Sequence, residues 1–186
     1  MQLRDLVLIR LGVAVNLVIG QLVAALLLPF YLDSMGTMLV AALVGPRAAI
    51  ITGLTSQVLA AVLSGNFTWL PFGIVQVAIA IYAAGAARVG VFRSLRSALP
   101  AGLLLGVIST SLSSPISYYV FGGATAGGVS ALTAALRVVG IPLWLSVAIA
   151  GGTTDLVDKT VCFGLVCLIL RNLPSHLAAR FPALAH

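Results

Sequence analysis

The sequence predicts an all-α integral membrane protein, a bundle of six transmembrane helices with both termini in the cytoplasm. Of the 186 residues, 61% are hydrophobic and 8% are charged, whereas soluble domains usually carry charge on about 25% of their positions. Apolar runs of the length that crosses a bilayer, about 17 to 25 residues, recur along the whole chain. Because no polar block interrupts them, we expect one membrane domain over residues 1–186.

Apolar runs separated by helix breakers predict six spans, over residues 6–28, 34–44, 48–63, 70–87, 99–121 and 145–170. The second run is shorter than a bilayer requires, so it is expected to be tilted, broken or extended into its loops. The first follows Arg4 as a secretory signal would, but it extends to Leu28 and leads into further membrane sequence, so we expect it to be retained.

The basic residues predict the orientation, because Lys and Arg collect in cytoplasmic loops. Eight of the ten fall at the ends of the chain or in the second and fourth loops: Arg4, Arg10, Arg47, Arg88, Arg93, Arg96, Arg171 and Arg180. The exceptions are Arg137 in the fifth loop and Lys159 in the last span. This bias explains the net charge of +6 without a nucleic-acid partner. The first, third and fifth loops then face outward, and the glycine-rich fifth loop, residues 122–142, is either a lid or a plain linker.

Asp33 is one of only four acidic residues, and it lies between two apolar runs in Tyr31-Leu-Asp-Ser-Met-Gly-Thr37. Its carboxylate can cap the second helix by accepting free backbone amides, or it can contact a ligand from the outer loop. Both roles are compatible.

The last span carries Asp155, Asp158 and Lys159. Helical spacing places Asp155 beside the other two on one face. Ionisable groups inside a bilayer are costly and usually face a site or a paired contact. Lys159 can therefore neutralise one aspartate in a structural lock while the other meets water or a hydroxyl, or Asp155 can form the floor of an outward-facing pocket.

Amides, hydroxyls and aromatic rings in the outer halves of the spans complete the candidate site. The aromatic residues are either interfacial anchors or stacking surfaces for a planar ligand. Asn66 matches a glycosylation sequon but is interpreted as a polar loop residue. The candidate ligand contacts are Asp33, Gln57, Asn66, Trp69, Gln76, Ser114, Tyr118 and Asp155. The two carboxylates would favour a donor-rich or cationic ligand.

Small residues recur every four positions in the first span, at Gly12, Asn16, Gly20 and Ala24. A second stripe in the fourth span comprises Ala80, Ala83, Ala84 and Ala87. Such stripes allow close helix contact, either within the bundle or with a partner subunit.

The cysteines and histidines offer neither a metal set nor a catalytic pair. Cys162 and Cys167 lie in one apolar helix without metal-ligand spacing, and His176 and His186 fall in the tail. We therefore expect no metal, no cofactor and no enzymatic activity.

The chain resembles the substrate-binding S components of energy-coupling factor (ECF) transporters, which take up vitamins and similar micronutrients. The resemblance covers nearly the whole chain and rests on its size, the six spans, Leu32-Asp-Ser-Met-Gly-Thr37 leading to Leu43-Val-Gly-Pro-Arg47, and Asp155-Leu-Val-Asp-Lys159 leading to Leu170-Arg-Asn-Leu-Pro174.

The resemblance implies a prokaryotic plasma-membrane protein that captures a micronutrient from outside. A transmembrane coupling subunit and ATPase subunits would then drive uptake, and the chain itself has no GxxxxGK[ST] phosphate loop. Family members present small residues of the first helix to the coupling subunit, so the stripe from Gly12 to Ala24 is the expected partner contact. The alternative is a membrane sensory or scaffolding module that binds a ligand or partner without transport.

Overall fold

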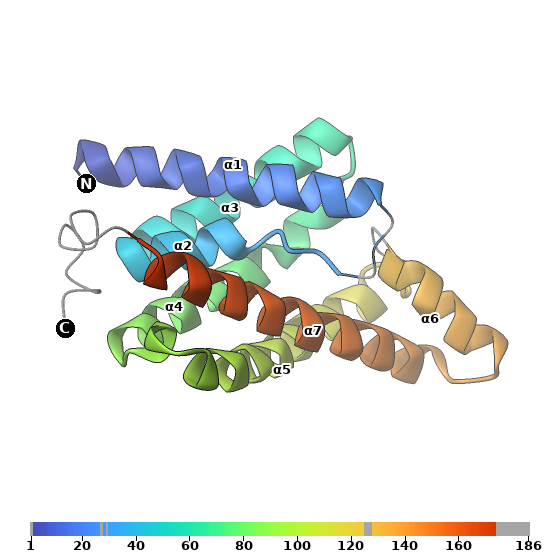
Figure 1. Ribbon diagram of the computed structural model, residues 1–186. Coiled ribbons are helices and arrows are strands. Elements are labelled where there is room, and N and C mark those ends of the chain that lie inside the picture. Colours follow the sequence, from blue (N-terminus) through green and yellow to red (C-terminus); the bar gives the residue numbers. More distant parts are fainter. Residues whose placement is uncertain (1, 27, 29, 125–127, 174–186) are drawn as a thin grey trace.

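The computed structural model describes residues 2–26, 28, 30–124 and 128–173, and every element among them is helical (Figure 1). The elements are α1 (Leu3–Ala25), α2 (Met35–Leu43), α3 (Pro46–Ser64), η1 (Phe67–Phe72), α4 (Gly73–Arg88), η2 (Val91–Arg93), α5 (Leu95–Tyr119), α6 (Gly128–Val138) and α7 (Leu143–Arg171). Arg180, His176, His186 and the C-terminus lie outside the described residues.

Four stretches are long and apolar enough to cross a membrane: Leu3–Ala25, Pro46–Ser64, Phe67–Arg88 and Leu95–Tyr119. This confirms an all-helical chain of membrane-protein type. α7 has 29 residues, so its length of about 43 Å at 1.5 Å per residue also exceeds a bilayer core. It carries Asp155, Asp158 and Lys159 near its middle. By contrast, α2 has nine residues and is too short to cross alone.

Local sequence explains several helix ends. α3 begins with Pro46 at its first position, where the missing amide costs no hydrogen bond. It ends at Gly65, whose left-handed φ of 64° stops the helix without steric strain. α5 begins after Ser94, whose hydroxyl accepts a hydrogen bond from the Ser97 amide.

The helix pair with the most extensive contact is α5 with α7, which lie side by side in Figure 1. Glycines on α5 allow this approach. A Cβ atom added to Gly102 would lie 2.7 Å from Cα of Thr160, and one added to Gly106 would lie 2.7 Å from Cα of Leu156. The backbones of the two helices are therefore in direct contact.

The short helix α2 lies inside the bundle and contacts α1, α3, α4 and α7. Its Gly36 packs on Gly12 of α1 so tightly that a Cβ atom at position 36 would overlap the Gly12 carbonyl oxygen. Met38 of the same helix, α2, is fully buried. The predicted second span is thus a buried core helix, which explains how a nine-residue apolar segment is accommodated.

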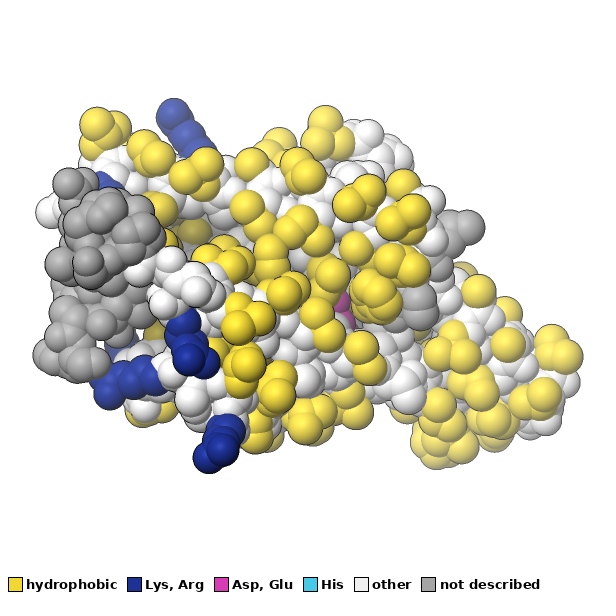
Figure 2. All heavy atoms as spheres, in the orientation of Figure 1, with side chains coloured by type: hydrophobic (Ala, Val, Ile, Leu, Met, Phe, Trp, Pro, Cys, Tyr) yellow, Lys and Arg dark blue, Asp and Glu magenta, His cyan; other side chains and the backbone are white. Residues whose placement is uncertain are grey.

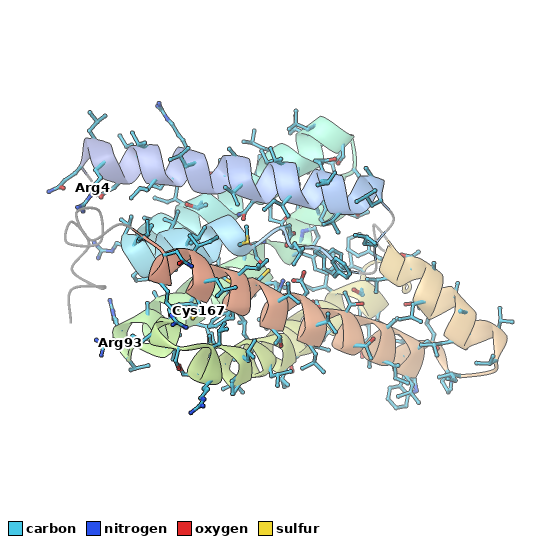
Figure 3. All side chains as sticks on the ribbon, viewed as in Figure 1. Arg4, Arg93 and Cys167 are labelled. Carbon is cyan, nitrogen blue, oxygen red and sulfur yellow. The ribbon has the colours of Figure 1, made fainter. Side chains whose placement is uncertain are left out.

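One end of the bundle is basic. Figure 2 shows arginine side chains gathered at the end where α1 begins, while hydrophobic side chains cover the rest of the visible face. Figure 3 places Arg4 and Arg93 at this end, and Cys167 farther into the bundle. Arg47, Arg88 and Arg171 belong to helix ends of the same side by the element order. The loops between α1 and α2 and between α5 and α7 lie at the opposite end.

The fifth loop contains a helix that the sequence did not predict. Residues 128–138 form α6, which packs against α7 and extends from the bundle (Figure 1). Val129 and Thr133 are its buried residues. The segment is therefore more than a plain linker, and its role as a lid stays a prediction.

Candidate functional site

A cavity opens among the helices in the half of the bundle away from the basic end. It encloses about 770 Å³ of empty space, a figure that includes the part open to the exterior. Its wall comes from the α1–α2 loop, α3, η1, α4, α5, α6 and α7. Six of the eight candidate ligand contacts line it: Asp33, Gln57, Trp69, Gln76, Ser114 and Asp155.

The remaining two candidates lie elsewhere. Asn66 begins η1, where its side-chain oxygen accepts hydrogen bonds from the amide and the hydroxyl of Thr68. Tyr118 packs edge-on against Tyr119, with ring centroids 4.9 Å apart. Neither is part of the lining of this cavity.

Asp158 is fully buried and engages Lys159 as an ion pair. Its Oδ1 atom accepts hydrogen bonds from the backbone amides of Tyr31 at 3.0 Å and Leu32 at 2.6 Å. Leu32 has a φ of 49°, an uncommon conformation for a residue with a bulky side chain. Asp158 therefore fastens the strained α1–α2 loop to α7.

Lys159 contacts the same loop, because its ammonium group also donates to the Ser34 hydroxyl at 3.2 Å. The sequence favoured Asp155 as the neighbour of both Asp158 and Lys159. In the structure the two adjacent residues pair with each other, as in the structural lock that the sequence left open. The lock and the pocket coexist, since Lys159 and Asp155 both line the cavity.

Asp155 is 5% exposed and forms part of the cavity wall. Its Oδ2 atom accepts hydrogen bonds from the hydroxyls of Thr110 at 3.2 Å and Ser113 at 3.0 Å. Both donors come from α5, so the serine-rich face of that helix is turned toward this carboxylate. Hydroxyl donors stabilise a buried carboxylate without neutralising its charge.

Asp33 lines the cavity from the α1–α2 loop and is partly exposed. Burial against protein atoms raises the pKa of Asp33 to about 6, and the nearby Asp158 and Asp155 carboxylates act in the same direction while Lys159 opposes them. The N-cap of α2 is Ser34 rather than Asp33. Of the two roles that the sequence left open for Asp33, capping of α2 is thus not observed, and contact with a ligand stays a prediction.

The free amides at the start of α2 are served by Asn16 instead. The Gly36 amide donates to the Asn16 side-chain oxygen at 2.7 Å. The Asn16 amide group donates to the hydroxyls of Thr37 at 2.9 Å and Ser56 at 3.1 Å. Thr37 in turn donates to Gln76 Oε1 at 3.1 Å, so a buried chain of hydrogen bonds connects α1 to the cavity wall.

This network corrects the expected partner contact on α1. Gly12 and Asn16 are buried inside the bundle, so they are not available to a partner subunit. Gly20 and Ala24 are partly exposed and line a second cavity. The stripe on α4 is likewise internal, since Ala80, Ala83, Ala84 and Ala87 are buried.

The second cavity lies between α1, the α1–α2 loop and α3, with about 1020 Å³ of empty space including its open part. Four residues line both cavities: Tyr31, Asp33, Gln57 and Trp69. The rings of Tyr31 and Trp69 meet edge to face with centroids 6.4 Å apart. These side chains form a thin wall between the two spaces.

Several lining residues were not among the predicted contacts. Tyr31 and Phe72 contribute aromatic surface, and Val129 and Thr133 contribute the buried face of α6. Burial and the Asp155 and Asp33 carboxylates raise the pKa of Tyr31, which keeps its phenol neutral. The i, i+4 spacing of Val129 and Thr133 was the available signal for α6, but eleven residues are too few for a span.

Within the described part of the chain, no group of three His, Cys, Asp or Glu side chains is placed to hold a metal ion. Cys162 and Cys167 are free and buried. The fold and the cavity together define a helical protein of membrane type with a pocket lined by polar and aromatic side chains. Comparisons with protein-family models, curated proteins and solved structures found no match.

Proposed function

We propose that the protein is the substrate-binding subunit of an ECF-type transporter, which captures a vitamin or similar micronutrient and hands it to partner subunits for ATP-driven uptake. The observation that supports this most directly is the cavity lined by Asp33, Asp155 and Trp69. It combines a few polar groups with a largely apolar wall, which is typical of small-molecule sites. Binding rather than catalysis is its chemistry.

The proposed orientation places the basic end in the cytoplasm, as the distribution of Lys and Arg favours. The cavity half of the bundle then faces outward, where a nutrient arrives. In this arrangement α7 crosses the bilayer as a further span, and its three ionisable groups face the interior of the bundle, as the cost of such groups in lipid requires. α2 completes the set of six as a short helix enclosed by the others.

In the proposal, release of the ligand requires the partner subunits. The α1–α2 loop and α6 form part of the cavity wall, and in the proposal ligand release involves a change in that wall. In the proposal a transmembrane coupling subunit imposes that change and ATPase subunits supply the energy. The proposed location of the protein is a prokaryotic plasma membrane, with both termini in the cytoplasm.

Two measurements test the proposal. Native mass spectrometry of gently purified protein should detect a retained small molecule, and Asp155→Asn should reduce its occupancy. Uptake of that molecule into cells should require both this protein and a coupling module with ATPase subunits. Retention without any dependence of uptake on such a module would favour a sensory or scaffolding role. Absence of a bound molecule, together with unchanged uptake of every nutrient tested in a deletion strain, would contradict the proposal.

A further inference from the structure

We infer that the ligand of the cavity is an organic cation with an apolar or aromatic body, whose charged nitrogen lies between Asp33 and Asp155. This rests on the proposed function, because it takes the cavity as the ligand site. It goes further by committing to one charge class and by excluding ligands whose recognition group is a carboxylate or phosphate.

The groups in and behind the cavity wall carry an excess of negative charge. Asp33 and Asp155 line the cavity from two different elements, the α1–α2 loop and α7. The ammonium group of Lys159 also lines it but is already paired with the third carboxylate, Asp158. Three carboxylates thus face one ammonium group, and within the described residues neither Asp33 nor Asp155 has an ion-pair partner of its own. A cation would compensate this excess, and an anion would increase it.

Several polar atoms of the cavity lining have no hydrogen-bond partner among the described residues. Both hydroxyl donors to Asp155 bond its Oδ2 atom, and among the described residues Oδ1 has no partner. Gln57 is 5% exposed and lines the cavity, yet no described residue bonds its side-chain amide. The carbonyl oxygen of Gln57 is an acceptor for the N–H groups of a bound cation. Ser114 Oγ, also on the cavity wall, is buried without a hydrogen-bond partner among the described residues, which is rare unless something else satisfies the group.

Aromatic side chains form another part of the cavity wall. Trp69, Tyr31 and Phe72 line the same cavity as the two carboxylates. Cations are attracted to the faces of aromatic rings, most strongly to Trp, and the attraction increases when water is excluded. The same rings provide apolar surface for the body of the ligand. Carboxylates, amide and rings therefore favour one kind of occupant.

The test uses Trp69 as a reporter. The chain has two tryptophans, and Trp144 is 59% exposed and outside the cavity lining, so Trp144→Phe leaves Trp69 as the only indole. This variant is titrated in detergent at neutral pH with three probes of one shape: 2-phenylethylamine, 2-phenylethanol and 3-phenylpropionate. They differ in carrying a positive charge, no charge or a negative charge.

We expect the amine to bind at least about tenfold more tightly than the alcohol, and the carboxylate to show no saturable binding. Asp33→Asn and Asp155→Asn should each weaken amine binding by about tenfold and leave alcohol binding nearly unchanged. The matched control is Asp5→Asn, because Asp5 pairs with Arg4 at the basic end and is not part of the cavity. Size-exclusion elution of each variant confirms that it is folded.

The outcomes separate the two proposals. If the alcohol or the carboxylate binds as tightly as the amine, the cavity still binds ligands but the cation inference is wrong. The same holds if the molecule retained by the wild-type protein in native mass spectrometry is anionic or uncharged. If none of the probes binds and no molecule is retained, the cavity is not a ligand site and both proposals fail.

Discussion

The carboxylate of Asp158 accepts a 2.6 Å hydrogen bond from the backbone amide of Leu32, 126 positions earlier in the chain. The same oxygen accepts from the Tyr31 amide, and the other oxygen pairs with Lys159. One buried side chain of α7 thus fixes the position of the α1–α2 loop, which carries Tyr31 and Asp33 into the cavity wall.

Asp158→Asn should therefore be among the most destabilising single changes in α7. It leaves the buried ammonium group of Lys159 without its partner, and breaking a buried ion pair from one side costs about 3 to 5 kcal/mol. The free energy of unfolding in mixed detergent micelles measures this loss. Adding Lys159→Met to Asp158→Asn removes both charges and should recover a large part of it. A double variant that is less stable than Asp158→Asn would contradict the assigned pair.

Gly36→Ala should disrupt the contact between α1 and α2. The added methyl group would overlap the Gly12 carbonyl oxygen, and neither backbone can move without breaking the bond from Gly36 to Asn16. Overpacking of this kind costs about 3 kcal/mol or more when backbone atoms are involved. Thermal unfolding monitored by circular dichroism should show a large decrease in the midpoint.

Gly85→Ala is the matched control for that substitution. Gly85 lies in α4, and a Cβ atom there meets nothing within 4 Å. Alanine is a better helix former than glycine by about 1 kcal/mol, so this variant should be as stable as the wild type or slightly more stable. Equal destabilisation by both variants would show that Gly36 is not in close contact with α1.

The pH dependence of the free energy of unfolding should reveal the raised pKa of Asp33. Its pKa is about 6 in the folded protein and 3.8 as a free side chain, so between about pH 4 and 6 the folded chain binds more protons than the unfolded chain. The free energy of unfolding should consequently fall as the pH rises through this window. Asp33→Asn should remove this component, while the contributions of the other carboxylates remain in both proteins. Identical pH profiles for the two proteins would contradict the raised pKa.

Cysteine labelling should report the orientation of the bundle. The native Cys162 and Cys167 are fully buried, so the wild-type protein should not react with a membrane-impermeant maleimide and serves as the blank. Val138→Cys, at an 87% exposed position at the end of α6, should react in intact cells. Arg93→Cys, at the basic end, should react only after the membrane is opened. The reverse pattern would overturn the proposed orientation.

Long apolar runs made most of the fold predictable. The predicted span 99–121 corresponds to α5 and the predicted span 145–170 to α7, because hydropathy over twenty or more residues depends little on tertiary context. α6 was missed because its eleven residues follow a glycine-rich segment that is typical of loops. The burial of α2 inside the bundle was also not predictable, since an apolar helix can face lipid or protein equally well.

The candidate site was predictable as a set of residues but not as a set of contacts. Ionisable and amide groups are rare in spans, so Asp155 and Gln57 were conspicuous, and both line the cavity. The pairing of Asp158 with Lys159 depends on a loop more than 120 positions away, which helical spacing cannot reveal. For the same reason the α1 stripe was assigned to a partner, although Asn16 bonds residues of α2 and α3.

The hydrogen bond from the Leu32 amide to Asp158 links the position of the α1–α2 loop to the charged residues of α7. If the α1–α2 loop is drawn outward, Asp158 loses two amide donors and keeps Lys159 as its ion-pair partner. If Lys159 is drawn toward a different anion, the strained backbone at Leu32 is less firmly anchored. Displacement of the loop and of the charges in α7 are then coupled, so a change at either place affects the other.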